Sequence, residues 1–169
     1  MKKPKPHTNP TKQSNPWLTD AEVKELIKVA SATRLNAFCH RSKHKIGASV
    51  LTADGKIFGG CNVEAVISGL GTCAERCAID NAVANGYYNF RAVCCVDSQL
   101  TPCCGACLQY LVLFSQVSGE EIFLVNAGTD GTFEVDKLSQ ALPLGYKTQS
   151  NLDDIQAFNA KSHKKRKKK

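Results

Sequence analysis

Apolar positions along this chain switch between helical and strand-like spacing, and the first helical segment has a clear start signal. Thr19-Asp20-Ala21-Glu22 is a capping box, in which a threonine and a glutamate three residues later satisfy the first amides of a helix. The apolar residues that follow recur every three or four positions, as on one face of a helix: Val23, Leu26, Ile27, Ala30 and Phe38. We therefore predict a helix that starts at residue 20.

Several short apolar runs predict strands. Runs at 46–51 and 56–61 flank Ala53-Asp54-Gly55, a sequence that favours a hairpin turn. Runs at 92–96 and 122–125 are apolar throughout, which is typical of strands buried on both faces. A weaker strand should follow the turn at 129–131.

Helical segments separate these runs. One is predicted over 73–85, stopped by Gly86 at the C′ position. The next begins near Cys104, and a short one covers 137–141. The order helix, strand, strand, helix, strand, helix, strand predicts an α/β fold, a three-layer α/β/α sandwich around a central mixed sheet of about five strands.

Charge divides the chain of 169 residues into a folded middle and two basic ends. The net charge of +7 comes from 1–17, which is also proline-rich, and from 161–169; without them, 11 basic and 15 acidic residues remain. We predict disordered segments at 1–17 and 161–169 around one domain at 18–160. A solvated tail is the simplest interpretation of 161–169, with a nuclear address or loose polyanion contact as the alternative.

The cellular compartment in which the protein resides affects how its cysteines are interpreted. No apolar run is long enough for a membrane span, and the basic N-terminus lacks the apolar core of a secretory signal, so we expect a cytoplasmic protein. In a reducing compartment, clustered cysteines favour metal binding or catalysis over disulfides. Five of the nine cysteines fit as small buried hydrophobic residues: Cys39, Cys61, Cys77, Cys94 and Cys95.

The remaining cysteines have the spacing of a catalytic zinc site. Cys73 stands two residues before Glu75, and Cys104 and Cys107 form a Cys-x-x-Cys pair about thirty residues on. Three protein ligands leave the fourth position of a tetrahedral zinc for water. Both groups fall at predicted helix starts, where the dipole favours thiolate. Cys103 would give the wrong spacing to Cys107, so Cys104 is the predicted ligand. Half of a structural zinc ribbon, or a pair of Cys73 with Cys77, is the competing interpretation.

Three segments together resemble the cytidine deaminase family. They are Gly60-Cys61-Asn62-Val63-Glu64, Gly71-Thr72-Cys73-Ala74-Glu75-Arg76 and Cys104-Gly105-Ala106-Cys107-Leu108-Gln109, and the similarity runs over about 37–146. The resemblance implies a hydrolase of pyrimidine salvage that converts cytidine or deoxycytidine to the uridine form and releases ammonia. It implies that zinc activates water for attack at C4, and that Glu75 moves the protons.

The resemblance also implies the substrate contacts. Asn62 and Glu64 would bind a ribose hydroxyl, and Arg76 would partly neutralise the thiolates. Further substrate contacts would come from Ala74, His44 and Tyr146. The family's neighbouring subunits complete one another's sites, so a homo-oligomer, most simply a tetramer, is expected.

This chain departs from the family pattern at several substrate contacts. His44 stands where an aromatic residue usually flanks the base, and Ala65-Val66-Ile67-Ser68 replaces the usual segment after the ribose-binding glutamate. Leu108 replaces an arginine, and Cys103 replaces a proline. Two alternatives follow: a deaminase of another aminopyrimidine nucleoside, of the blasticidin type, or a nucleic-acid-binding or editing deaminase that uses the basic tail.

Overall fold

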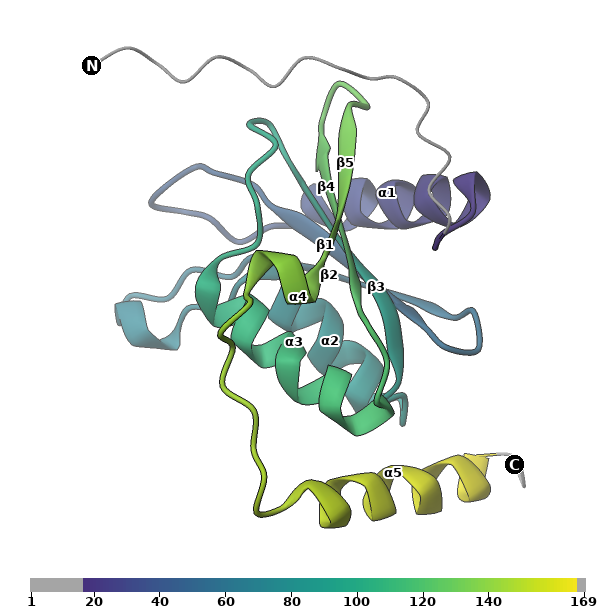
Figure 1. Cartoon of the computed structure of the whole chain (residues 1–169). Helices are drawn as coiled ribbons and strands as arrows, with labels where there is room; N and C mark the ends of the chain where they lie inside the picture. Colours follow the sequence, from purple (N-terminus) through teal and green to yellow (C-terminus); the bar gives the residue numbers. More distant parts are fainter. Residues whose placement is uncertain (1–16, 167–169) are drawn as a thin grey trace.

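A mixed sheet of five strands forms the centre of the computed structural model, which describes residues 17–166 (Figure 1). Its order is β2-β1-β3-β4-β5, and only the β3–β4 pair is parallel. The strands are β1 (Gly47–Thr52), β2 (Ile57–Cys61), β3 (Phe90–Asp97), β4 (Phe123–Gly128) and β5 (Phe133–Lys137). The predicted number of strands and the mixed sheet are confirmed.

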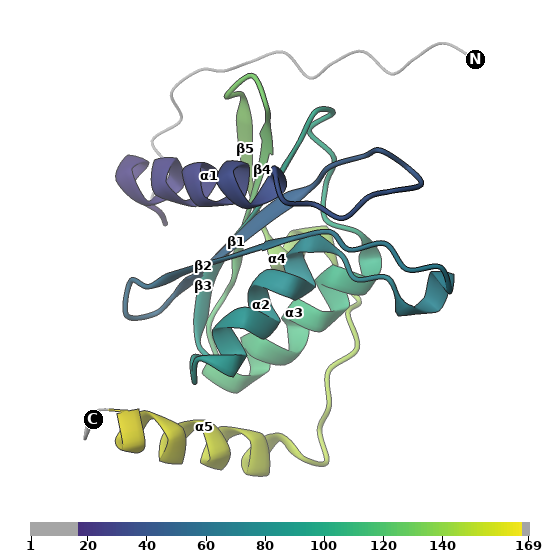
Figure 2. The ribbon, with the colours of Figure 1, turned by 180° about the vertical axis from the view of Figure 1, so that it is seen from behind.

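Helices cover both faces of this sheet, as Figure 2 shows from the opposite side. Helix α1 (Asp20–Arg34) lies on one face, and α2 (Ala74–Ala84) and α3 (Gly105–Ser118) lie on the other. Alternate residues of the central strands therefore enter different cores: Val50 and Val93 pack on the α2–α3 side, and Leu51 and Ala92 on the α1 side. The predicted α/β/α sandwich is confirmed.

The helix boundaries follow the local signals in the sequence, with one exception. Thr19 and Glu22 form the predicted capping box of α1, and α2 ends before Gly86, whose φ is +83°. Phe38, counted with the first helix, lies beyond its end at Arg34 and is exposed. The shorter helices are η1 (Ser68–Leu70) and α4 (Leu138–Ala141).

Helix α5 (Leu152–Arg166) was not predicted, and it moves the expected domain boundary at residue 160. Helix α5 contacts α3 through polar side chains. Gln156 donates a hydrogen bond to the Gln116 carbonyl, and Asn159 donates one to the Val117 carbonyl. Few apolar residues take part, so hydrophobic periodicity gave no signal. The predicted disorder of 161–169 is therefore wrong for the helical residues up to Arg166, and 1–16 and 167–169 lie outside the described residues.

Across the described part of the chain, no helix has both the length and the apolar character needed to cross a membrane.

Candidate active site

Two helix starts meet beside the ends of the central strands, and each carries a cysteine at its N-cap. Cys73 caps α2 and Cys104 caps α3, both with extended backbone, while Cys107 is buried in the first turn of α3. The three Sγ atoms all lie within 4.8 Å of one another, and Cys73 and Cys104 Sγ are 3.9 Å apart. Thiolates about 2.3 Å from a tetrahedral zinc are separated by about 3.8 Å. The cluster therefore fits a zinc ion.

The protonation of these cysteines also suits a metal. Hydrogen bonding from Cys107, then from Cys104 and Arg76, lowers the pKa of Cys73 to about 5. A thiolate therefore exists at neutral pH, and zinc binds thiolate rather than thiol. Cys104 is exposed and leaves the cluster open on one side.

Glu75 lies next to this cluster in the first turn of α2 and is only 4% exposed. Burial raises the pKa of its carboxyl, and the nearby charge of Cys73 raises it further. Side-chain hydrogen bonding from Cys103 and Cys107 partly offsets this rise in the pKa. A buried carboxyl with a raised pKa is suited to take up and release a proton, as a general acid and base must.

Cys103 is a neighbour of the cluster and does not belong to it. Among the described residues, the group that could hold a metal contains Cys104, as the spacing to Cys107 predicts. Cys103 is buried, and burial raises the pKa of its thiol well above the usual value. It lies against Glu75, at the position where the sequence departs from the family's proline.

A cavity of about 320 Å³ opens beside the cluster, within the range of small-molecule sites. Cys73, Cys104 and Glu75 contribute to one end of its lining, and Asn62 and Glu64 contribute to the rest. Other lining residues come from the loops before α2 and α3: Ala65, Gly71, Thr72, Thr101 and Pro102. The cavity therefore joins the candidate metal site to the residues expected to contact the substrate.

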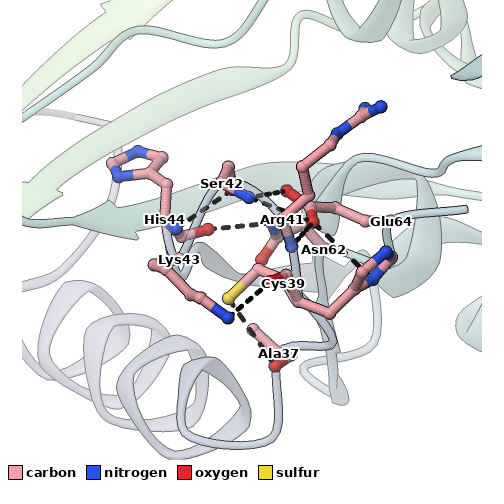
Figure 3. Close-up of polar contacts among 9 residues, drawn as sticks. Ala37, Cys39, Arg41, Ser42, Lys43, His44, Asn62 and Glu64 are labelled. Carbon is pink, nitrogen blue, oxygen red and sulfur yellow. Dashed lines mark hydrogen bonds and ion pairs between the residues drawn. The ribbon is translucent and has the colours of Figure 1, made fainter.

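Asn62 and Glu64 hold the loop at 40–46, as Figure 3 shows. Asn62 Oδ1 accepts the backbone N–H of Ile46 at 2.9 Å, and its Nδ2 donates to the carbonyl of His44 at 3.0 Å. Glu64 accepts the backbone N–H of Arg41 at 2.7 Å and that of Ser42 at 3.1 Å. Both side chains retain capacity for a further hydrogen bond.

These contacts fix the charge of Glu64. Hydrogen bonding by the Ser42 side chain, then by the backbone of Arg41, lowers the pKa of Glu64 to about 2. The carboxylate stays ionised at neutral pH and so can only accept hydrogen bonds.

Asp97 is a functional candidate that sequence reasoning missed. It ends β3, its side chain is 1% exposed, and it lines the cavity. Its Oδ1 accepts the backbone N–H groups of Gln99 and Thr101, and its Oδ2 faces His44 Nε2 at 3.3 Å. The sequence did contain a signal for Asp97: it is an acidic residue that directly follows an apolar run and precedes the loop that carries Cys103 and Cys104.

The other residues predicted to contact the substrate do not line the cavity. His44 is directed at Asp97 and is not among the lining residues, and neither is Tyr146, whose surface is 76% exposed. Gln109 holds the Tyr146 backbone through two hydrogen bonds of 2.8 Å. Ala74 is fully buried under β2, and Arg76 donates to the carbonyl of Gly71. Within a single chain, Tyr146 and Ala74 therefore do not line the cavity.

Comparisons with known proteins agree with this arrangement. A family model described as the cytidine and deoxycytidylate deaminase zinc-binding region matches residues 20–119. A cytidine deaminase of Mycobacterium tuberculosis is 40% identical over 141 residues, covering 82% of this chain and 96% of that protein. A probable cytidine deaminase of Dictyostelium discoideum is 41% identical over 101 residues, covering 57% of this chain and 68% of that protein. The structure of cytidine deaminase from Burkholderia pseudomallei matches with a TM-score of 0.66 and 35% identity, covering 73% of this chain and 98% of that one.

Proposed function

Because this chain belongs to the cytidine deaminase family, we propose that it hydrolyses cytidine or deoxycytidine to the uridine form with release of ammonia. One observation carries the proposal: a buried carboxyl, Glu75, stands beside three cysteine sulfurs with zinc-ligand spacing, at the end of a cavity.

In this proposal Cys73, Cys104 and Cys107 hold the zinc. When bound, zinc supplies a water of lowered pKa. Glu75 would move the protons of the reaction: one proton of the attacking water goes to N3, and the other goes to the amino group. The water oxygen becomes bonded to C4, the C4–N bond breaks and the amino group leaves as ammonia, so that water and cytidine give uridine and ammonia. The enclosed position of Glu75 keeps bulk water from exchanging these protons.

The residues around this centre would orient the nucleoside. Glu64 accepts a sugar hydroxyl with its remaining lone pairs, and the free N–H of Asn62 donates to the sugar. Arg76 offsets part of the negative charge of three thiolates on one divalent ion. Asp97 positions the loop that leads to Cys104 through its bonds to Gln99 and Thr101.

Assembly into a homotetramer is part of the proposal. The segment between β2 and α2 exposes four large apolar side chains, Val63, Val66, Ile67 and Leu70. Ala65, in the same segment, lines the cavity. A second copy on this segment would cover the apolar surface and close the cavity at the same time, and Tyr146 could then contribute to a neighbouring site. We place the assembly in the cytoplasm, in pyrimidine salvage.

The test is ammonia release by purified, zinc-loaded protein from a panel containing cytidine, deoxycytidine, cytosine, a blasticidin-type nucleoside and a cytosine-containing oligonucleotide. Cytidine or deoxycytidine should be deaminated, and the Glu75→Gln variant should be the inactive control. Turnover of the blasticidin-type compound alone, or of the oligonucleotide alone, would contradict the proposal.

The role of the C-terminal basic segment belongs to the same experiment. A chain ending at Arg166 keeps α5 complete and removes only lysines. Its turnover of cytidine should equal that of the full chain, because the described residues that line the cavity lie between 41 and 104.

A further inference from the structure

His44 links the loop at 40–46 to the loop at 98–103, which leads from β3 to Cys104. Both loops contribute residues to the lining of the cavity. His44 lies on the first loop, and its Nε2 is 3.3 Å from Oδ2 of Asp97, the residue at which β3 ends and the second loop begins. The proposed deamination gives this contact no role.

The loop at 98–103 satisfies only one oxygen of the Asp97 carboxylate. Oδ1 accepts the backbone N–H of Gln99 at 2.9 Å and that of Thr101 at 3.0 Å. Oδ2 is buried, accepts no hydrogen bond from the part of the chain that the structure describes, and faces His44 Nε2. Burial alone would raise the pKa of Asp97, but hydrogen bonding from Thr101 and Gln99 and the proximity of His44 lower it, so the carboxylate is ionised at neutral pH. Since a buried anionic oxygen without a partner is unfavourable, the position of His44 stabilises this carboxylate.

Each of the two loops contains a residue with a strained backbone. Lys43, next to His44, has a φ of +59°, and Leu100, between the two residues whose N–H groups bind Asp97, has a φ of +54°. This left-handed conformation is unfavourable for residues other than glycine, above all for a bulky one such as leucine. It persists only where the surrounding contacts hold it. Both loops therefore depend on their anchors, and Asp97 is an anchor of both.

The backbone of His44 is held separately from its ring. Its carbonyl accepts a hydrogen bond from Asn62 Nδ2 at 3.0 Å, and its N–H donates to Ser42 Oγ at 3.0 Å. Figure 3 shows the imidazole turned away from Asn62 and Glu64. Because the backbone is already fixed, the ring loses little conformational entropy when it contacts Asp97. A hydrocarbon ring has no N–H to donate, so the departure from the family's aromatic pattern at His44 creates this contact.

We propose that His44 is a positioning residue, which fixes the loop at 98–103 through Asp97 so that the two loops keep one arrangement around the bound nucleoside. The proposal rests on the deamination proposed for the same site. His44 is not among the residues that line the cavity, so it acts through Asp97 and does not touch the substrate. Glu75 and Cys107 are held independently of this contact by α2 and α3. The loss of His44 should therefore weaken substrate binding more than proton transfer.

Hydrogen exchange of single backbone amides tests the link between the loops without any measurement of activity. In His44→Leu, which removes the donor, the amides of Gln99 and Thr101 should exchange about tenfold faster than in the wild type, as expected for the loss of a hydrogen bond to a charged group. His44→Gln retains an N–H donor and should lie closer to the wild type. Lys45→Gln changes the same loop outside the cavity lining and should leave both rates unchanged. Unchanged rates in His44→Leu, or equal acceleration of all slowly exchanging amides, would overturn the proposal.

Steady-state kinetics of the zinc-loaded protein test the consequence for the reaction. His44→Leu should raise KM for cytidine about 3- to 10-fold and change kcat less than about twofold, because the loops and not the proton-transfer group are displaced. His44→Gln should recover most of the loss, and the zinc content of both variants should match the wild type. A fall in kcat at unchanged KM would contradict a role in positioning the cavity lining.

A double-mutant cycle tests whether His44 acts through Asp97. In an Asp97→Asn background, His44→Leu should change kcat/KM by less than about twofold, because its partner is already altered. Effects that multiply in the double variant would show that the two residues act independently and would overturn the proposal. If the wild type deaminates no cytidine, the proposed function fails, and the exchange rates of Gln99 and Thr101 still decide whether His44 holds the loop at 98–103.

Discussion

The metal end of the cavity and its rim are constructed in different ways. At the metal end, Cys73, Glu75, Cys104 and Cys107 belong to the first turns or N-caps of two helices packed on the sheet. At the rim, the loop at 40–46 is held by individual side-chain contacts, among them the hydrogen bonds from Asn62 and Glu64 and the contact between His44 and Asp97. Secondary structure fixes the chemistry, whereas side-chain contacts fix the surface that meets the substrate. The metal end should therefore tolerate little change, and the rim can vary between relatives without loss of the fold.

The departures from the family pattern follow this division. His44 and the segment at 65–68 belong to the rim, whereas the ligand cysteines and Glu75 keep the family arrangement. Cys103 and Leu108 are the exceptions, because both lie close to the metal end.

The largest effect is expected from removal of a ligand. Cys104→Ala should reduce bound zinc from about one per chain to almost none and abolish turnover, because two thiolates do not hold zinc as three do. Cys103→Ala is the matched control, since it removes a thiol one residue away that is not in the cluster. Zinc content by metal analysis decides the outcome, and loss of zinc from Cys103→Ala would show that the ligand assignment is wrong.

The second largest effect is expected from replacing the buried carboxyl of Glu75. Glu75→Gln should keep its zinc and its fold but lose about 10²–10⁴ in kcat, because the side chain can no longer transfer protons. Steady-state kinetics and zinc analysis on the same preparation separate the two properties. A variant with near-normal kcat would remove Glu75 from the mechanism.

The junction between β2 and α2 should also be sensitive. A Cβ at Gly60 would stand 2.3 Å from the backbone nitrogen of Ala78 and 2.7 Å from the carbonyl oxygen of Ala74, so α2 would have to move. We expect Gly60→Ala to lower the free energy of unfolding by about 1–3 kcal/mol, and to reduce activity because α2 carries Glu75. Urea denaturation provides the measurement.

Gly69→Ala is the control for that substitution, because within the described residues no atom outside its chain neighbours lies within 4 Å of a Cβ built there. Its free energy of unfolding should stay within about 0.5 kcal/mol of the wild type. If both variants lose the same stability, close packing of α2 on β2 is not what requires Gly60.

The smallest effect is expected at the rim and depends on pH. The pKa of Glu64 is lowered from 4.5 to about 2, so its contribution to stability is complete above about pH 4.5 and is lost as the pH falls toward 2. The difference in unfolding free energy between the wild type and Glu64→Gln should therefore shrink over this range. Urea denaturation at several pH values measures it, and a difference that is independent of pH would contradict the proposed charge of Glu64.

Local chemistry explains most of what could be predicted. The capping box at Thr19, the stop at Gly86 and the two cysteine groups each depend on neighbours within a few residues, and the structure contains all of them. The five-stranded sandwich followed from the order of apolar segments. Helix α5 was missed because its contacts with α3 are polar and its apolar residues are few.

The sequence by itself determined the reactive groups: three cysteines, a glutamate two residues after the first, and helix starts that favour thiolate. These are properties of chemical identity and short spacing, which a chain carries before it folds. Only the tertiary structure decided that Asp97 faces His44, that Glu64 binds the loop at 41–42, and that Tyr146 lies outside the cavity. Such contacts join residues 20 or more positions apart, and their geometry depends on how the sheet places separate loops at one edge.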